Sequence, residues 1–250
     1  MHPVALSFLL GLTAAAANVV GGLVVVEHTW KRADARLSGR ISLKYFIALG
    51  SGFMLATALL EMVPASLARA GEQALVFVLG GYLLVHFFEH TISPHFHFGE
   101  EVHPEEVIHP RVSYAAVLGM GIHTFFDGVG IAAGFVVSEW LGMVIFLAVF
   151  LHKIPDGFTV ASLLLASGRR PATALWATVL LGIATLAGIA TMWLLRAEVS
   201  WGLALAAGAT LYVAASDLIP EVNREPGIKM AVWVFVGVAS MLGLKYLVGV

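Results

Sequence analysis

Long apolar stretches separated by short polar joints make up most of this chain. Eight stretches stand out, and each has about the 20 residues that a helix needs to cross a bilayer. They run roughly over residues 4–26, 43–67, 73–93, 112–137, 140–166, 172–195, 199–220 and 227–249. The first is too long for the apolar core of a signal peptide, and no basic segment precedes it. The pattern predicts an all-α polytopic membrane protein with eight transmembrane helices in one domain, residues 1–250.

Composition supports a membrane protein and narrows its chemistry. Charged residues make up 12% of the 250 residues, and hydrophobic residues make up 59%. Soluble domains carry roughly 25% charged residues. The net charge of -2 gives no indication of a nucleic-acid partner. Because the chain has no cysteine, a metal site would use His, Asp, Glu, Asn or carbonyl ligands.

Lysine and arginine are distributed unevenly between the two sets of joints. The joints after spans 1, 3, 5 and 7 hold ten of them, and the other side holds only Arg69, Arg196 and Lys245. The ten are Lys31, Arg32, Arg36, Arg40, Lys44, Arg111, Arg169, Arg170, Arg224 and Lys229. Cytoplasmic loops are enriched in basic residues. The bias therefore predicts cytoplasmic joints after these four spans, with both termini outside the cytoplasm.

Ionisable residues occur inside two of the predicted spans. Span 4 carries His123 and Asp127, and span 5 carries His152, Lys153 and Asp156. A charge near the bilayer centre costs roughly 2.5–3.5 kcal/mol on insertion scales. Metal coordination or mutual pairing is the default explanation for so many charges. The less specific reading is that these His–Asp pairs only hold the helices together.

The spacing of these residues favours metal coordination. In each span the His and Asp are four residues apart, so they share one helix face. His123 lies 12 residues beyond Arg111, or roughly 18 Å along a helix, which is near mid-membrane. Because the two helices run in opposite directions, Asp127 is expected outward and Asp156 inward of a histidine pair. Two nitrogens and two oxygens suit Zn²⁺ and also Fe²⁺, Mn²⁺ or Cd²⁺.

The two polar segments also repeat each other. His-Thr-Phe-Phe-Asp-Gly at 123–128 matches His-Lys-Ile-Pro-Asp-Gly at 152–157. A repeat in antiparallel spans indicates two inverted halves around a midplane site. Pro155 lacks an N–H and so frees the Leu151 carbonyl, which could supply a further oxygen near this site.

Other acidic residues lie near the ends of spans. Glu61, near the outer end of span 2, is either an entrance residue or a solvated interfacial acid. Asp217 and Glu221 lie near the inner end of span 7. They are interpreted as an exit pathway, with interfacial pairing to Arg224 as the alternative.

His86, Glu89 and His90 form an H-x-x-E-H pattern near the inner end of span 3. As a hydrolase motif it would supply two zinc ligands and a general base. The alternative function is therefore an intramembrane zinc-dependent hydrolase. That reading leaves the charges of spans 4 and 5 unexplained, and a simpler one places the three residues on a cytoplasmic release pathway.

Residues 94–111 form a His/Glu-rich joint that we expect in the cytoplasm. It contains Glu100, Glu101, Glu105 and Glu106 together with His95, His97, His103 and His109. Clustered histidines are typical of weak metal binding. The irregular spacing defines no geometry, so an ordinary polar loop is the alternative.

The chain resembles the ZIP (Zrt/Irt-like) family of metal transporters, bacterial type, over nearly its whole length. The segments 123–128, 152–157 and 211–221 carry the resemblance, with weaker support from 59–64, the small-residue run 182–190 and the His-rich joint. The resemblance implies eight helices in a 3+2+3 arrangement, metal bound between spans 4 and 5, and alternating access. It implies a transporter in the bacterial inner membrane that moves Zn²⁺ into the cytoplasm, with no enzymatic activity and no organic cofactor. Small-residue helix faces are compatible with a homodimer.

Two departures from the family pattern concern the centre. Many members hold a second metal through an Asn-like residue, an acid and often a Glu in span 6. Here these positions are Thr124, Lys153 and a small apolar run. We therefore expect one metal, with the Lys153 ammonium in place of the second cation. The span 5 acid is often Glu and is Asp156 here, which leaves the metal preference open.

Overall fold

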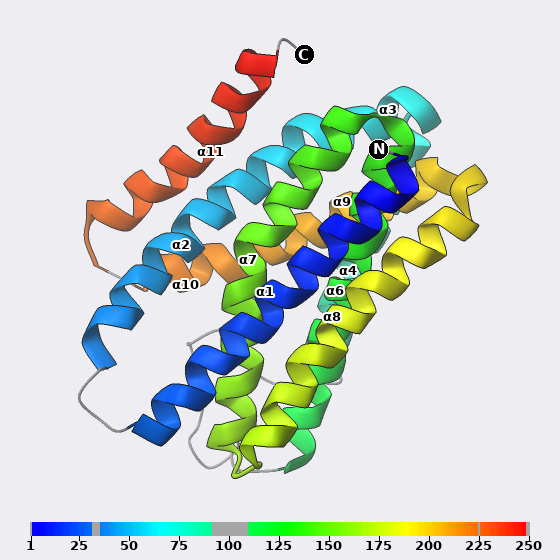
Figure 1. Ribbon diagram of the computed structural model, residues 1–250. Helices are drawn as coiled ribbons and strands as arrows, with labels where there is room; N and C mark the ends of the chain where they lie inside the picture. The colour runs from blue at the N-terminus through cyan, green and yellow to red at the C-terminus, as the bar shows by residue number, and fades with distance from the viewer. Residues whose placement is uncertain (1, 32–35, 92–109, 225, 249–250) are drawn as a thin grey trace.

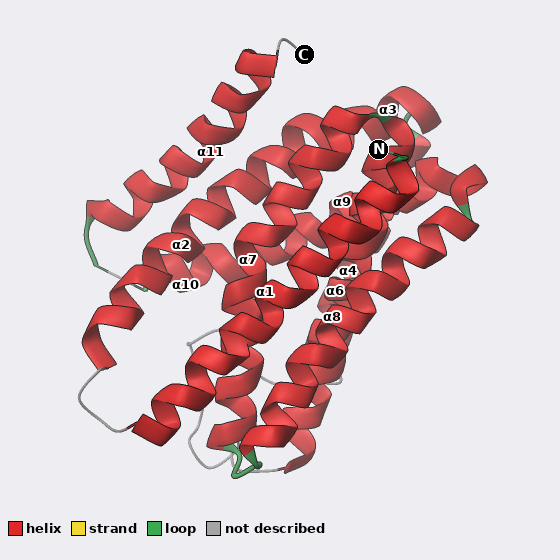
Figure 2. Ribbon diagram, viewed as in Figure 1, coloured by secondary structure: helices red, strands yellow, loops and turns green. Residues whose placement is uncertain are grey.

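A computed structural model describes residues 2–31, 36–91, 110–224 and 226–248, and in these ranges the regular structure is helical (Figure 1, Figure 2). The longer helices are α1 (Pro3–Lys31), α2 (Arg36–Thr57), α4 (Gln73–Thr91), α6 (Pro110–Val137), α7 (Glu139–Ala166), α8 (Pro171–Leu194), α9 (Val199–Tyr212) and α11 (Ile228–Val248). Short helical segments connect some of them: η2 (Ala58–Met62), α3 (Val63–Ala70), η3 (Arg196–Glu198), η4 (Val213–Leu218) and α10 (Ile219–Asn223).

The predicted spans correspond to these helices. Within the described residues, seven continuous helical stretches are long and apolar enough to cross a membrane. The remaining one, predicted span 3, falls on α4, whose apolar part, Gln73–Glu89, is shorter. Span 2 continues from α2 through η2 into α3, and span 7 continues from α9 through η4 into α10. The prediction of an all-α polytopic membrane protein is confirmed.

Local sequence signals set the helix ends on either side of α7. The Ser138 hydroxyl accepts a hydrogen bond from Leu141 N at 3.1 Å and so caps the start of α7. After α7 the chain turns at Gly168, whose φ of 76° favours glycine. Pro171 then begins α8, where its missing N–H has no cost. Ser138, Gly168 and Pro171 therefore account for the start of α7, the turn after it and the start of α8.

Two π-helical segments interrupt spans 2 and 7 at equivalent places. Segment η2 contains Glu61, three residues before Pro64, and η4 contains Asp217, three residues before Pro220. Proline cannot donate to the preceding turn, and a wider turn accommodates the lost hydrogen bond. π-Segments of this kind are frequent at functional sites. Both π-helical segments thus have the same acid-to-proline spacing.

Glycines bring four pairs of helices into close backbone contact. In each pair, a methyl group added to either glycine would collide with a backbone carbonyl of the facing helix. That carbonyl belongs to the residue three positions before the facing glycine. The pairs are α1 with α7 through Gly21 and Gly157, α6 with α8 through Gly128 and Gly188, α2 with α11 through Gly52 and Gly237, and α4 with α9 through Gly81 and Gly208. Small residues permit this approach in membrane helices. These eight glycines therefore have a packing role.

The pairings reflect an internal symmetry of the bundle. Helices α1 and α7 both run from the upper to the lower end of Figure 1, so they pack in parallel. Helix α1 begins and α11 ends at the upper end, as an even number of crossings requires (Figure 1). An inverted repeat would match spans 1, 2 and 3 with spans 6, 7 and 8, and span 4 with span 5. The α1–α7 glycine pair then corresponds to the α8–α6 pair, and the α2–α11 pair corresponds to the α9–α4 pair. This supports two inverted halves, while the 3+2+3 grouping stays a prediction.

Candidate metal centre

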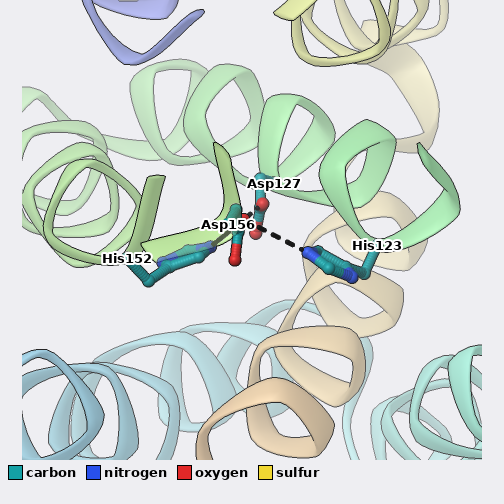
Figure 3. Close-up of side chains that lie close together, drawn as sticks. All are labelled: His123, Asp127, His152 and Asp156. Atoms are coloured by element: carbon teal, nitrogen blue, oxygen red, sulfur yellow. Dashed lines mark hydrogen bonds and ion pairs between the residues drawn. The ribbon is translucent and has the colours of Figure 1, made fainter. Parts of the chain in front are cut away.

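Four side chains from two adjacent helices converge in the interior of the bundle (Figure 3). His123 and Asp127 come from α6, and His152 and Asp156 come from α7. One potential ligand atom from each lies within 4.8 Å of the others, and each residue is at most 4% exposed. We call these four residues the central quartet. The two H-x-x-x-D-G segments therefore meet, as their spacing predicts.

Within the quartet each histidine faces the aspartate of the other helix. His123 Nε2 lies 3.4 Å from Asp156 Oδ2, and His152 Nε2 lies 3.2 Å from Asp127 Oδ2. The two rings are 6.4 Å apart between centroids. This differs from the expected histidine pair flanked by two aspartates. Because α6 and α7 are antiparallel, equal His-to-Asp spacing places each His beside the opposite Asp, in two layers.

The donor set and its spacing fit a divalent transition metal. Zinc bonds of about 2.0–2.2 Å to nitrogen and oxygen place tetrahedral ligands roughly 3.4 Å apart. Three of the N–O separations, 3.2, 3.4 and 3.7 Å, are already close to that value. Only small movements would bring all four atoms onto one ion.

The ammonium of Lys153 lies between the two carboxylates. Its Nζ is 2.5 Å from Asp127 Oδ2 and 2.9 Å from Asp156 Oδ2, the same oxygens that face the histidines. The Thr124 hydroxyl oxygen is 3.4 Å away, and Lys153 is fully buried. Two carboxylates and one ammonium leave a formal charge of -1 when both histidines are neutral. Lys153 thus provides the buried aspartates with a cation from the chain itself.

Each histidine has an oxygen atom behind its ring, at hydrogen-bond distance for His152 and at ion-pair distance for His123. His152 Nδ1 lies 3.0 Å from the Ala148 carbonyl oxygen, an acceptor that leaves Nε2 free to face the quartet. His123 Nδ1 lies 3.5 Å from Glu89 Oε1 of α4. A carboxylate or carbonyl behind a ligating histidine fixes its tautomer and orientation. The quartet therefore has the surroundings of a metal site.

Polar side chains continue from the quartet toward the predicted cytoplasmic end. Glu89 contacts the side chains of both Tyr212 and Asp217 as well as His123. His86 packs against Tyr212, with ring centroids 5.9 Å apart. The structure therefore brings three of the predicted pathway residues together. The His90 side chain and the residues His95, His97, His103 and His109 lie outside the described part of the structure.

Two further acids that the sequence singles out are paired. Glu221 Oε2 lies 3.4 Å from Arg224 Nη1, three residues later, which matches the interfacial pairing considered as the alternative. Glu61 is 9% exposed; its Oε1 accepts from Lys245 Nζ at 2.7 Å, and its Oε2 accepts from Trp140 Nε1 at 3.1 Å. We call Glu61 and Lys245 the outer ion pair.

Apolar side chains separate the quartet from the outer ion pair. Around Gly130, one turn beyond Asp127 on α6, lie the side chains of Met62, Ile145 and Ala206. Met62 and Ala206 are fully buried, and Ile145 is 1% exposed. The Leu151 carbonyl, considered as an extra ligand, lies beside Gly50 of α2. The described residues thus give the quartet polar neighbours on one side and apolar neighbours on the other.

Sequence reasoning missed several contributors to these sites. Trp140 and Tyr212 look like ordinary interfacial or core aromatics, and no local pattern connects them to Glu61 or Glu89. Lys245 offered a signal, because it is the one charged residue of span 8 beyond Lys229.

Comparison with known proteins finds relatives among metal transporters. A sequence model described as ZIP zinc transporter matches residues 99–245, which include the whole quartet. The zinc transporter GufA of Myxococcus xanthus is 32% identical over 185 residues, which are 70% of this chain and 72% of that protein.

Two longer relatives match over about half of this chain. The metal cation symporter ZIP14 of Xenopus tropicalis is 32% identical over 115 residues, 45% of this chain and 25% of the relative. The zinc transporter foi of Drosophila melanogaster is 28% identical over 117 residues, 46% of this chain and 17% of the relative. This chain therefore covers a quarter or less of each of these two proteins.

Proposed function

This chain belongs to the ZIP zinc transporter family, and from that premise we propose that it moves Zn²⁺ into the cytoplasm by alternating access through the central quartet. The observation that carries the proposal is the convergence of His123, Asp127, His152 and Asp156 in a buried place between α6 and α7. Metal is the substrate here. A site for a transported ion must bind it and then release it.

Lys153 is the feature that would make the quartet reversible. Its ammonium contacts both carboxylates, so an arriving metal has to displace it. Charges of +2 and +1 held roughly 4 Å apart repel by about 8 kcal/mol at an effective dielectric constant of 20. The ammonium therefore moves away when the metal binds and returns when the metal leaves. This supports a single-metal centre in which Lys153 replaces a second ion.

Release toward the cytoplasm follows the polar side chains beyond His123. Glu89 lies directly behind the His123 ring, and Asp217 lies beside Glu89. A metal leaving Asp156 would meet oxygen ligands at each step. Glu221 and His86 continue this inner side, and the histidines of joint 94–111 would accept released metal weakly.

Entry from the outside would begin at Glu61. Along α7, Trp140, which donates to Glu61, precedes His152 by 12 residues, or roughly 18 Å. The apolar side chains around Gly130 occupy the space between. One group of helices must therefore rearrange against the other before metal from Glu61 can reach Asp127. This is the alternating step of the proposal.

The His86, Glu89 and His90 pattern does not make this chain a hydrolase. Members of this family are transporters and not enzymes. In the described residues, Glu89 contacts His123, Tyr212 and Asp217, which gives it a role next to the quartet. A hydrolase reading would leave the quartet without a purpose.

Location, orientation and substrate range complete the proposal. We place the chain, as a single domain, in the bacterial inner membrane with both termini outside, on the basis of the basic joints. The N₂O₂ donor set admits Fe²⁺, Mn²⁺ and Cd²⁺ beside Zn²⁺.

The faces that α4 and α11 expose are apolar, with Leu79, Phe87 and Phe235 among the most exposed residues. They suit lipid and are compatible with a homodimer.

The decisive experiment is zinc uptake into proteoliposomes. We expect wild type to take up Zn²⁺, and His123→Ala and Asp156→Ala to lower the initial rate at least about tenfold, since loss of even an outer-shell partner has that effect. His2→Ala, at the exposed start of α1, is the matched control. Normal transport by both quartet variants would show that the proposed site is wrong.

A further inference from the structure

The side chain of Asn18 on α1 is a buried amide without a recorded partner. It is 0% exposed, and within the described residues neither its Oδ1 nor its Nδ2 has a hydrogen-bond partner. Buried polar groups are almost always hydrogen-bonded, so an exception needs an explanation. Leaving such a group unpaired costs free energy that an apolar residue would avoid. An amide retained here therefore indicates a role in another state of the protein.

Asn18 lies at the same depth as Lys153. The close contact of α1 with α7 places the Asn18 carbonyl against Gly157 and the Ile154 carbonyl against Gly21. In this parallel pair, Gly21 is therefore level with Gly157, and Asn18, three residues earlier, is level with Ile154, next to Lys153. Lys153 and Gly157 are four residues apart and share one face of α7. The Lys153 side chain therefore starts from the face of α7 that meets α1 near Asn18.

Metal binding would leave the Lys153 ammonium without its carboxylate partners. Both of its present ion-pair acceptors, Asp127 Oδ2 and Asp156 Oδ2, belong to the quartet. Its third contact, the Thr124 hydroxyl at 3.4 Å, is a weak one. A fully buried ammonium needs acceptors wherever it moves. The flexible four-carbon side chain of lysine allows such a movement.

We propose that Asn18 receives the Lys153 ammonium when a metal ion displaces it from the central quartet. The Asn18 Oδ1 would then accept a hydrogen bond from Nζ, with Thr124 as the second acceptor. The amide is unpaired in this structure because the two aspartates hold the ammonium that it would receive. The inference rests on the proposed function, since it requires metal at the quartet. It makes Asn18 a positioning residue for Lys153, without direct contact to the metal.

A double-mutant cycle tests this coupling. Zinc affinity is measured by calorimetry on purified protein in detergent, for wild type, Asn18→Leu, Lys153→Met and the double variant. With Lys153 present, Asn18→Leu should weaken zinc binding about tenfold, because the displaced ammonium loses a charge-assisted hydrogen bond. In the Lys153→Met background, the same substitution should change affinity less than about twofold, because no ammonium needs a new partner.

Two results would overturn the inference, and a third would reject the proposed function. An equal loss in both backgrounds would overturn the inference, because it would show that Asn18 binds metal itself or only supports packing. Unchanged zinc binding by Asn18→Leu in the presence of Lys153 would also overturn it. Wild type that binds no zinc would instead reject the proposed function.

A second pair of measurements separates the proposed role from a folding defect. Thermal unfolding of the metal-free protein should show Asn18→Leu no less stable than wild type, because it removes an unpaired amide. Asn18→Asp should tighten zinc binding in the presence of Lys153, because a carboxylate is a stronger acceptor for an ammonium. If Asn18→Leu does not insert, Asn18→Ala replaces it in the same cycle, with the same two outcomes against the inference.

Discussion

Lys245, in the last turn of α11, donates a hydrogen bond to Glu61 in η2 across 2.7 Å. The two residues are 184 positions apart in the sequence, and the pairing of α2 with α11 brings them together. The Lys153 ammonium holds Asp127 and Asp156 in the same way. Carboxylates at two depths of the proposed pathway are thus each paired with a lysine. A metal ion moving inward would exchange with one ammonium after the other.

Replacing Lys245 by methionine should make Glu61 available to metal from outside. We expect the half-saturating zinc concentration for uptake to fall about twofold to fivefold, the range that a partly exposed ion pair is worth. Initial uptake rates over a series of zinc concentrations would measure it. Lys229→Met, at the exposed other end of α11, is the control and should match wild type. A half-saturating concentration that stays constant or rises would show that Lys245 does not compete with metal at Glu61.

Replacing Lys153 by methionine should separate binding from turnover. Without the competing ammonium, we expect zinc affinity to rise at least about tenfold, because the repulsion between Lys153 and a divalent ion is removed. Transport should slow, because no internal cation remains to replace the departing metal. Calorimetry reports the first effect and proteoliposome uptake the second. A loss of affinity would mean instead that Lys153 supports the site, and the exchange mechanism would be wrong.

The central quartet was predictable because two physical rules agree on it. Residues four apart on a helix share a face, and buried charges in a membrane need a purpose, so His123 and Asp127 pointed to His152 and Asp156. The crossed pairing of His with Asp depends on the relative register of α6 and α7, which no local pattern encodes. The sequence could place Lys153 beside His152 but could not show where its ammonium lies.

Contacts between distant helices were beyond prediction for a similar reason. The sequence placed Glu61 and Lys245 near the same end of the bundle, yet their contact depends on how α2 and α11 pack. The glycine contacts show the same limit. A glycine in an apolar span suggests close packing, but only the fold shows that Gly128 lies against α8 while Gly121 on the same helix has open space.

That contrast on α6 gives a stability prediction. A methyl group at Gly128 would collide with the Thr185 carbonyl of α8, and the neighbouring backbone has little room to move. We expect Gly128→Ala to destabilise the folded protein by about 1–3 kcal/mol, which is typical of overpacking. Gly121→Ala adds the same methyl with no atom within 4 Å and should behave as wild type. Thermal unfolding in detergent compares the two, and equal melting temperatures would show that α6 and α8 can separate without cost.

Glu89 tests whether the residues behind the quartet contribute to metal binding. Its Oε1 lies 3.5 Å from His123 Nδ1, so the carboxylate helps to orient the ring and favours the tautomer that leaves the Nε2 lone pair for a metal ion. Glu89→Gln keeps the size of the side chain but removes the charge. We expect zinc affinity to fall about tenfold or more, within the range known for outer-shell partners of metal-ligating histidines. Calorimetry measures this affinity directly.

The matched control is Glu139→Gln, which changes an exposed acid in the first turn of α7. It should leave zinc affinity unchanged, because Glu139 precedes His152 by 13 residues, or roughly 19 Å along the helix. A second comparison, Asp217→Asn, removes a carboxylate that contacts Glu89 and should affect affinity less than Glu89→Gln does. If Glu89→Gln binds zinc as tightly as wild type while Asp217→Asn slows uptake, Glu89 would serve only the release of metal. Its contact with the His123 ring would then contribute nothing to the free energy of zinc binding.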